Sequence, residues 1–184
     1  GGSSVMWDNT LTTDPNVGHI FSAPVVGQLP NGQWKVFVGN GYDSTSGKAA
    51  LLVIDVSNGS IDSVIADNDG GTGLGGVRLV RNSDQRVVAA YAGDLNGNLW
   101  RFDYQADGGR MAVGYQGKPL FTAASETGIK QAITAAPAAF PHPDGGTMVL
   151  FGTGKLLTDE DKRDRSVQTV YGVRDRIPAT ESTS

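Results

Sequence analysis

The sequence contains no cysteine, few charged residues and no long hydrophobic run. The lack of cysteine excludes disulfides, thiolate nucleophiles and cysteine-ligated metal centres, but it does not distinguish a cytosolic protein from a periplasmic one. The longest apolar stretch, residues 132–140, is interrupted by Thr134 and Pro137 and is far shorter than the ~20 residues that span a bilayer. We therefore expect no membrane span.

Charge is sparse, because Asp, Glu, Lys and Arg make up 18% of the chain, against ~25% in a typical soluble protein. The net charge is −4. A domain that binds nucleic acid should be strongly basic. The composition therefore excludes nucleic acid as a partner.

Glycine, in contrast, accounts for 26 of 184 residues, which indicates a turn-rich globular chain. Short β-branched or aromatic runs bounded by Gly, Asn, Asp or Pro are typical of strands. Such runs occupy residues 36–38, 50–54, 87–92, 99–102, 148–151 and 167–173. Helix is expected only as a turn or two at residues 126–136 and 158–165. The sequence thus predicts an all-β fold.

One unit occurs three times: a strand, a turn with glycine, a second strand and a second turn. Gly39, Gly93 and Gly152 hold the same place in the three copies, at spacings of 54 and 59 residues. These spacings slightly exceed the ~40–50 residues of a four-stranded β-propeller blade, and insertions would account for the excess. A glycine at the end of a buried strand permits a positive φ and a close approach between blades. The residues that define the repeat are Gly39, Gly93, Asp94, Gly97, Trp100, Phe102, Gly152 and Gly154.

Residues 94–98, Asp-Leu-Asn-Gly-Asn, form the clearest turn, because Asn-Gly between two hydrophobic runs is a strong hairpin signal. Asp94 is expected to accept hydrogen bonds from backbone N–H groups of this turn. In the following strand, Trp100 and Phe102 point to one face and Arg101 to the other. We expect the two rings to pack between blades.

The segment from Tyr91 to Asp103, YAGDLNGNLWRFD, closely resembles the C-terminal β-propeller of PilY/PilC-type type IV pilus biogenesis proteins and adhesins. Residues 32–44, GQWKVFVGNGYDS, resemble the Gly-Asn-Gly-Tyr blade of that family, and residues 133–137, 151–155 and 168–175 resemble a later blade. The resemblance implies about three propeller-like blades at residues 18–175, as a fragment of a larger propeller. Residues 1–17 are then a lead-in segment, and residues 176–184 are expected to be a flexible tail.

The same resemblance implies a non-enzymatic pilus biogenesis and adhesion module. It would support pilus extension, twitching motility and surface attachment. The implied partners are minor pilins in a pilus tip complex, and a host-surface protein or glycan. The implied location is the periplasm, the outer membrane surface or the pilus tip.

Calcium is a further implication, because relatives often carry an Asp-rich calcium loop before the Tyr-Ala-Gly-Asp strand. Here the corresponding residues 81–86 contain Asp84 as their one carboxylate, between two arginines. A calcium loop draws oxygen ligands from several acidic residues. Asp67 and Asp69 alternate as calcium ligands do but favour a solvated turn, and Asp94 is expected to stabilise its own turn. We therefore expect no metal and no other cofactor.

Catalytic residues are not expected, because no nucleophile elbow, phosphate-binding loop or zinc-protease motif occurs. Residues 159–165 are a mixed charge run and the most polar candidate contact surface. Two alternatives remain open. One is a quinone-cofactor dehydrogenase propeller of the pyrroloquinoline quinone type, whose Trp-bearing blade repeat the segment around Trp100 resembles. The other is a carbohydrate- or protein-binding propeller of unrelated lineage.

Overall fold

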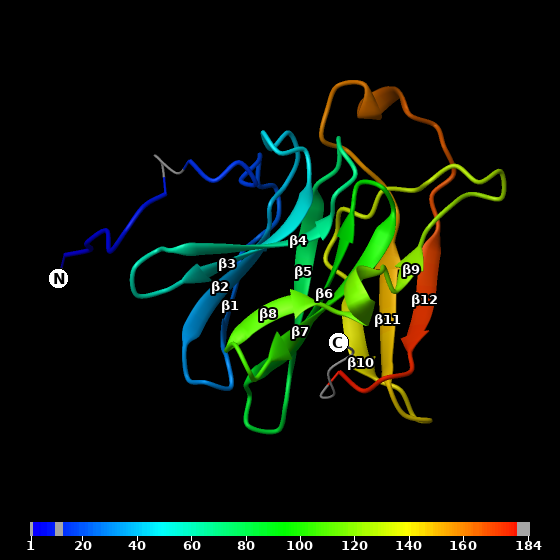
Figure 1. Cartoon of the computed structure of the whole chain (residues 1–184). Helices are drawn as coiled ribbons and strands as arrows, with labels where there is room; N and C mark the ends of the chain where they lie inside the picture. Colours follow the sequence, from blue (N-terminus) through cyan, green and yellow to red (C-terminus); the bar gives the residue numbers. More distant parts are fainter. Residues whose placement is uncertain (1, 10–12, 180–184) are drawn as a thin grey trace.

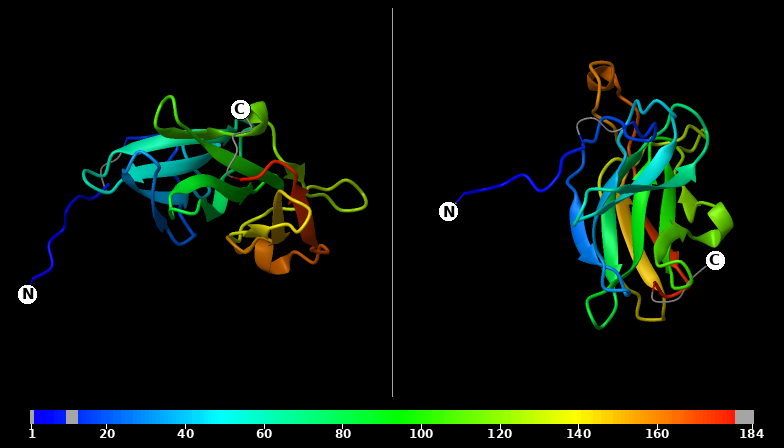
Figure 2. Two further views of the ribbon diagram at one scale, coloured as in Figure 1. Left: turned by 90° about the horizontal axis from the view of Figure 1, so that it is seen from below. Right: turned by 60° about the vertical axis from the view of Figure 1, so that its left-hand side comes forward.

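Figure 1 shows the computed structural model of the chain, which describes residues 2–9 and 13–179. Three antiparallel sheets follow one another along the sequence, and Figure 2 shows them side by side in that order. The described residues contain no α-helix and two 3₁₀ turns, η1 (Tyr115–Gly117) and η2 (Asp161–Arg163). None of the helical turns in this part of the chain is long enough to cross a membrane. The all-β prediction is confirmed.

The strands of each sheet lie in chain order. The first sheet contains β1 (Val25–Gln28), β2 (Trp34–Gly39), β3 (Ala49–Asp55) and β4 (Ile61–Asp67). The second contains β5 (Leu74–Arg81), β6 (Val87–Asp94), β7 (Asn98–Gln105) and β8 (Arg110–Val113), and β9 (Phe121–Thr122) also pairs with β7. The third contains β10 (Ala138–Pro141), β11 (Thr147–Gly152) and β12 (Val170–Asp175). The third sheet therefore has one strand fewer than the first.

Several local expectations need correction. The helix expected at residues 126–136 is wrong, because Ala124 pairs with Lys130 in a narrow hairpin whose Gly128 has a φ of 82°. The helix expected at residues 158–165 is reduced to η2. The last expected strand begins only at Val170. Six strands were not expected, namely β1, β4, β5, β8, β9 and β10.

Two core clusters lie on the two faces of the second sheet, and a third, smaller one is formed by Val38, Leu52 and Ile54 of the first sheet. Trp100 and Phe102 are 4% and 0% exposed and pack with Phe37 and Leu51 of the first sheet. On the opposite face, a cluster that includes Leu99 joins the second sheet to the third. The alternation predicted along β7 therefore places the rings between the first two sheets.

The three glycines of the repeat occupy equivalent positions at the end of a second strand. Gly39 pairs with Leu51, Gly93 with Leu99, and Gly152 with Val170. A Cβ on Gly39 would lie 2.0 Å from Gly75 O, and one on Gly93 would lie 2.2 Å from Ile133 Cγ2. Close approach between sheets therefore requires glycine at both positions.

Two parts of the glycine expectation are wrong. None of the three has a positive φ, which occurs instead in the turns at Gly41, Gly97 and Gly154. In addition, a Cβ on Gly152 would have no described atom within 4 Å. The third copy thus keeps the glycine without the close neighbour that the first two have.

The residue after each glycine holds the next turn through its side chain. Asn40 Oδ1 accepts from Ala50 N at 3.0 Å, Asp94 Oδ1 from Asn98 N at 2.8 Å, and Thr153 Oγ1 from Thr169 N at 2.8 Å. The three copies therefore share this side-chain hydrogen bond as well as the order of their strands.

The segments at both ends of the described chain contact the sheets. Trp7 Nε1 donates to Val56 O at 2.7 Å, and Asp14 accepts from Ser63 Oγ at 2.6 Å. At the other end, Arg101 donates to the carbonyls of Ile177 and Pro178. The sequence predicted a flexible tail at residues 176–184. Residues 177 and 178 of this tail make the contacts with Arg101, and residues 180–184 lie outside the described residues.

Candidate functional site

The Asp94 carboxylate is buried in the β6–β7 turn and organises it. In addition to Asn98 N, it accepts from Asn98 Nδ2 at 3.0 Å and from Trp100 Nε1 at 2.7 Å. Burial is the main cause that raises the pKa of Asp94 above its ordinary value, nearby Asp67 adds to it, and the donors from Trp100 and Asn98 oppose it. The hydrogen bond from Asn98 N is the role predicted for Asp94, and the bond from Trp100 Nε1 additionally connects the turn to the core.

Asp67 lies beside this turn, although sequence reasoning treated the two aspartates separately. Its Oδ2 accepts from Asn96 Nδ2 at 3.1 Å and Asn98 Nδ2 at 3.2 Å, and its Oδ1 accepts from Asp69 N at 2.8 Å. Asn96 and Asn98 therefore turn amide donors, rather than oxygens, toward the carboxylates. The arrangement satisfies the two acids without a metal ion.

Asp84, the remaining calcium candidate, lies apart from this cluster. Asp84 is in the β5–β6 turn, where its backbone N donates to Asn82 Oδ1 at 3.0 Å. In residues 2–9 and 13–179, no three His, Cys, Asp or Glu side chains are grouped so as to hold a metal ion. The absence of a tight calcium site stays a prediction, which is taken up in the Discussion.

A buried ionic cluster, made of Arg101, Asp103 and Asp175 with two tyrosines, joins the second and third sheets. Arg101 donates from Nε to Asp103 at 2.7 Å and from Nη1 to Asp175 at 2.8 Å, and all three side chains are at most 1% exposed. Tyr91 donates to Asp175 Oδ2 at 2.6 Å, and Tyr115 donates to the other oxygen. Burial, followed by Asp175, raises the pKa of both tyrosines, so they remain neutral donors.

Sequence reasoning found Arg101 but not its partners. Asp175 lies 84 residues from Tyr91 in the sequence, so no local pattern links them. The sequence feature that could have drawn attention to Asp175 is weak: residues 168–175 resemble a later blade of the family.

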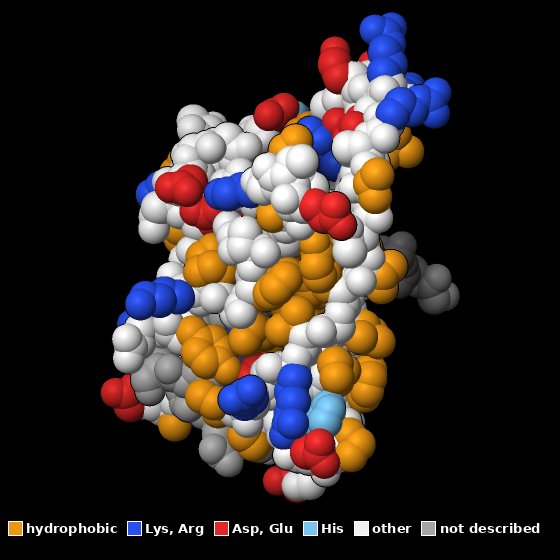
Figure 3. Space-filling model, turned by 90° about the vertical axis from the view of Figure 1, so that its right-hand side faces the viewer, with side chains coloured by type: hydrophobic (Ala, Val, Ile, Leu, Met, Phe, Trp, Pro, Cys, Tyr) orange, Lys and Arg blue, Asp and Glu red, His pale blue; other side chains and the backbone are white. Residues whose placement is uncertain are grey.

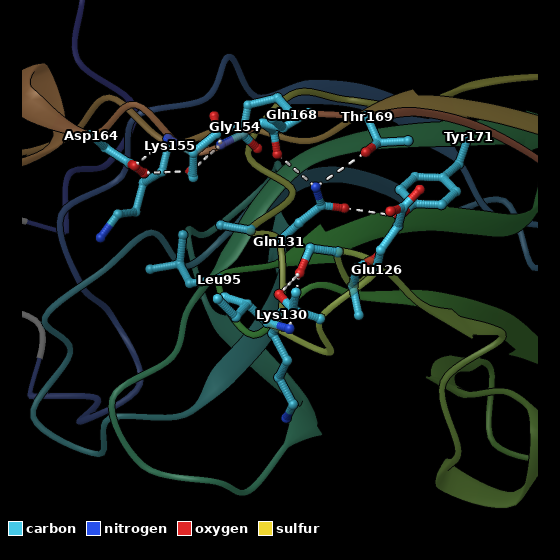
Figure 4. Close-up of a pocket in the computed structure, with 17 residues that line it drawn as sticks. Leu95, Glu126, Lys130, Gln131, Gly154, Lys155, Asp164, Gln168, Thr169 and Tyr171 are labelled. Carbon is cyan, nitrogen blue, oxygen red and sulfur yellow. Dashed lines mark hydrogen bonds between the residues drawn. The ribbon is translucent and has the colours of Figure 1, made fainter.

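A cavity of about 980 Å³ opens between the second and third sheets at the end where the β6–β7 turn lies (Figure 4). Its walls are the hairpin at residues 124–131 and the long β11–β12 loop at residues 153–169. We treat this cavity as the candidate functional site and call it the upper cavity.

Gln131 fixes the two walls of the upper cavity to each other. Its Nε2 donates to Val167 O at 2.8 Å and to Thr169 Oγ1 at 3.1 Å, and its Oε1 lies 2.8 Å from the Tyr171 hydroxyl (Figure 4). The Tyr171 ring packs against Phe121 and Phe151, with ring centroids 5.1 Å and 5.4 Å away. The floor is therefore held rigidly by hydrogen bonds and aromatic packing.

The rim of the upper cavity combines aliphatic and charged side chains. Ile129 is 68% exposed and Val167 is 80% exposed. The mixed charge run predicted as a contact surface lies in the β11–β12 loop, and its Asp164 lines the cavity. Exposed aliphatic side chains rimmed by polar groups are typical of a protein contact. The site suits binding of a partner.

Three successive antiparallel sheets, packed face to face and built from one repeated strand order, define this protein as a β-propeller type. A family model described as the PilY1 beta-propeller domain matches residues 8–183. The chain belongs to this family.

The relatives are type IV pilus proteins. The Pseudomonas aeruginosa type IV pilus biogenesis factor PilY1 is 41% identical over 196 residues, which cover 94% of this chain and 17% of the relative. A Xylella fastidiosa PilY1 homolog is 30% identical, covering 94% of this chain and 13% of the relative. The crystal structure of the Pseudomonas aeruginosa PilY1 C-terminal domain superposes with a TM-score of 0.85 at 39% identity, covering 97% of this chain and 42% of that chain. The chain thus spans less than a fifth of these two curated relatives and is a homologue of one part of a pilus biogenesis factor.

Proposed function

We propose that this chain is the binding part of a non-enzymatic factor that supports type IV pilus extension, twitching motility and surface attachment. The observation that carries the proposal is the family match across residues 8–183, on three repeated sheets. The curated relatives bear the name of pilus biogenesis factors rather than of enzymes. The proposed location is the periplasm, the outer membrane surface or the pilus tip.

The proposed partners are minor pilins in a pilus tip complex, and a host-surface protein or glycan during attachment. The upper cavity supports this proposal because its floor is rigid and its rim exposes Ile129 and Val167. Loops on a rigid scaffold commonly carry binding functions. The partner is expected to bury these two aliphatic side chains.

Cells that carry Ile129→Asp together with Val167→Asp test the proposal. We expect fewer surface pili and smaller twitching zones at an unchanged level of the protein. Loss of the pilus retraction motor should restore surface pili if the chain supports assembly against retraction. Val5→Asp is the matched control, because Val5 is 80% exposed and does not line the cavity. Normal piliation after deletion of residues 8–183 would reject the function, whereas normal piliation in the double variant alone would reject the cavity as the contact.

The quinone dehydrogenase alternative has less support. It depends on the blade motif around Trp100, and the Trp100 side chain is engaged in the core and by Asp94. Absorbance spectra of the protein with added pyrroloquinoline quinone and calcium would show bound cofactor if the alternative were right. If the chain were a carbohydrate-binding propeller of unrelated lineage, it should bind ligands on a glycan array. The Ile129→Asp, Val167→Asp variant should then no longer bind them.

A further inference from the structure

The third sheet ends on a strand whose outer edge is unpaired. Its strand order is β10-β11-β12, and no strand in the described part of the chain pairs with β12 on the side away from β11. Val170 corresponds to Leu51 and Leu99, because all three pair with the glycines of the repeat. Leu51 pairs on its outer side with Val64 of β4. Leu99 pairs in the same way with Phe121 of β9. β12 therefore lacks an outer neighbour that both other copies have.

The backbone groups on this free edge belong to Val170, Gly172 and Arg174. Thr153 N donates to Thr169 O at 2.8 Å, so the backbone groups of Thr169 face the β11 side. Because the backbone groups of successive residues point to alternate sides of a strand, those of Val170, Gly172 and Arg174 face outward. All three residues are exposed. The edge thus presents a row of N–H donors and carbonyl acceptors to solvent.

The described chain that follows β12 does not supply the missing strand. In the first two sheets, β3 and β7 each return through a short turn into β4 and β8. After β12, in contrast, the carbonyls of Ile177 and Pro178 accept hydrogen bonds from Arg101 of β7. Ala179 is 6% exposed and lines a cavity together with residues of β5 and β10. Because β10 is the opposite edge of the third sheet, the chain leads away from the free edge of β12.

The edge also lacks the features that usually keep strand edges unpaired, which are proline and charged side chains along the edge. Of its three outward residues only Arg174 is charged, and its guanidinium donates across the sheet to the carbonyls of Asp144 and Gly145 in the β10–β11 turn. Val170 is 81% exposed. The first strands of the sheets adjoin one another, since β5 contacts β1 and β10, so β12 lies on the outer side of the molecule (Figure 1). A partner can therefore reach the edge.

We propose that β12 binds an extended segment of a partner protein, which adds to the third sheet as a fourth, antiparallel strand. Backbone groups in such a row pair with another strand, and the side chains of that strand add specificity. A β-branched or aromatic residue of the partner faces Val170, as Val64 and Phe121 face its equivalents. The beginning of β12 adjoins the upper cavity, which Thr169 and Tyr171 line. The proposal thus describes how the partner binds, and it rests on the proposed function for the identity of that partner.

The test uses the intact protein and the blocked peptide acetyl-Lys-Glu-Thr-Tyr-Thr-Val-Lys-amide. In the antiparallel register, its Val faces Val170, its Tyr faces Gly172 and its Glu faces Arg174. Hydrogen exchange measured at single residues should slow at the amides of these three β12 residues when the peptide binds. The amides of Tyr171 and Val173 face β11 and should change little. This alternation is the signature of strand pairing.

Two N-methylated forms of the peptide separate backbone pairing from side-chain contacts. Methylation of the peptide Glu, Tyr and Val nitrogens removes the donors that face β12, and it should weaken binding by about tenfold or more. Methylation of the two Thr nitrogens is the matched control, because their N–H groups point away from β12 and affinity should be unchanged.

Gly172→Pro tests the same contact from the side of the protein, since it removes the central N–H donor of the edge and leaves the bonds to β11 in place. It should weaken peptide binding by about tenfold. Gly172→Ala is the control, because it keeps this N–H group. If Gly172→Pro fails to fold, Val170→Pro at the first residue of β12, compared with Val170→Thr, gives the same answer.

Three results would overturn the proposal. The first is equal affinity of the two methylated peptides. The second is slow exchange at Val170, Gly172 and Arg174 in the free monomeric protein, which would show that a strand of the protein itself fills the edge. The third is a dimer that Gly172→Pro dissociates, which would assign the edge to a second copy of the chain. Piliation of the Ile129→Asp, Val167→Asp variant tests the pilus function separately, so failure of strand pairing and failure of the pilus function are distinguishable.

Discussion

The indole Nε1 of Trp100 donates a 2.7 Å hydrogen bond to Oδ2 of Asp94, six residues earlier in the same hairpin. Both residues are buried, at 4% and 0% exposure. A buried indole N–H needs an acceptor, and a carboxylate that closes a turn supplies it. The propeller motif therefore couples the geometry of the β6–β7 turn to the core between the first two sheets.

Asp94→Ala should destabilise the protein by at least about 2 kcal/mol, because it leaves Trp100 Nε1 and Asn98 N without their acceptor. Asp94→Asn should cost less, since Asn40 fills the equivalent place in the first sheet and accepts two backbone N–H bonds. Urea unfolding at pH 7 measures the loss of stability in both variants.

The stability that Asp94 contributes should depend on pH, because burial raises its pKa in the folded protein. This contribution is fully present below the ordinary Asp pKa of ~3.9 and is lost as pH rises through the pKa of the folded state. The stability of wild type relative to Asp94→Asn should therefore fall with rising pH above about 3.9, and a difference that grows with pH would contradict this.

Trp100→Ala should cost about 3–5 kcal/mol, because it removes a large side chain from the core between two sheets. The matched control is Trp34→Ala, since Trp34 is 54% exposed on β2, and surface substitutions usually stay within about 0.5 kcal/mol. Denaturant unfolding compares the two variants. Similar losses for both would show that burial is not what makes Trp100 important.

The sequence predicted best the strands whose residues are buried on both faces. Each of the strands β3, β6 and β7 contains six consecutive buried residues. The strands that were not expected are different. The outer strand β4 is only half buried, with polar Asp62 and Ser63 within it. The inner strand β5 contains Gly75 and Gly76, which are not typical strand residues but permit close approach to Thr134 and Ala136.

The upper cavity and the ionic cluster could not be predicted in the same way. They depend on side chains that meet across sheets, such as Gln131 with Thr169, or Arg101 with Asp175. Sequence patterns report the face on which a side chain lies, but not its partner on a neighbouring sheet. Arg101 was correctly placed opposite Trp100, whereas its counter-ions were missed.

Asp175→Ala should destabilise the protein by about 3–5 kcal/mol, because Arg101 would remain buried with one of its two carboxylate partners removed. Tyr91→Phe removes a single donor to the same carboxylate and should cost about 1 kcal/mol. Unfolding in urea gives both values. If Asp175→Ala cost no more than Tyr91→Phe, the cluster would not be the main link between the second and third sheets.

Calcium should not change the melting temperature. The oxygens of Asp67 and Asp94 already accept N–H donors from the β6–β7 turn and from Asp69, whereas calcium needs about 6–8 oxygen ligands. A tight site at 100 times its dissociation constant would add about 2.7 kcal/mol. Thermal melts with millimolar calcium and with chelator are therefore expected to coincide. A shift of several degrees would disprove this, and Asp84→Ala compared with Asp67→Ala plus Asp69→Ala would identify the loop.

Hydrophobic side chains are exposed on the side of the molecule where β12 lies (Figure 3). On the third sheet, Phe140, Leu150 and Val170 are 46%, 38% and 81% exposed. A Cβ on Gly152 of the same sheet would have no described atom within 4 Å. The equivalent Gly39 packs against Gly75 of the following sheet, and Gly93 packs against Ile133, which precedes the third sheet. We therefore expect a further sheet to cover this face.

Substitution of the three glycines by alanine tests that expectation. Gly39→Ala and Gly93→Ala should each cost more than about 2 kcal/mol, because the new Cβ would overlap Gly75 O in the first case and the Ile133 side chain in the second. Gly152→Ala in residues 1–184 alone should be close to neutral, since its Cβ would meet open space. In a longer protein that includes the following sheet, Gly152→Ala should become as costly as the other two. An equal and small effect in both lengths of protein would show that the third sheet ends the stack without a close neighbour at Gly152.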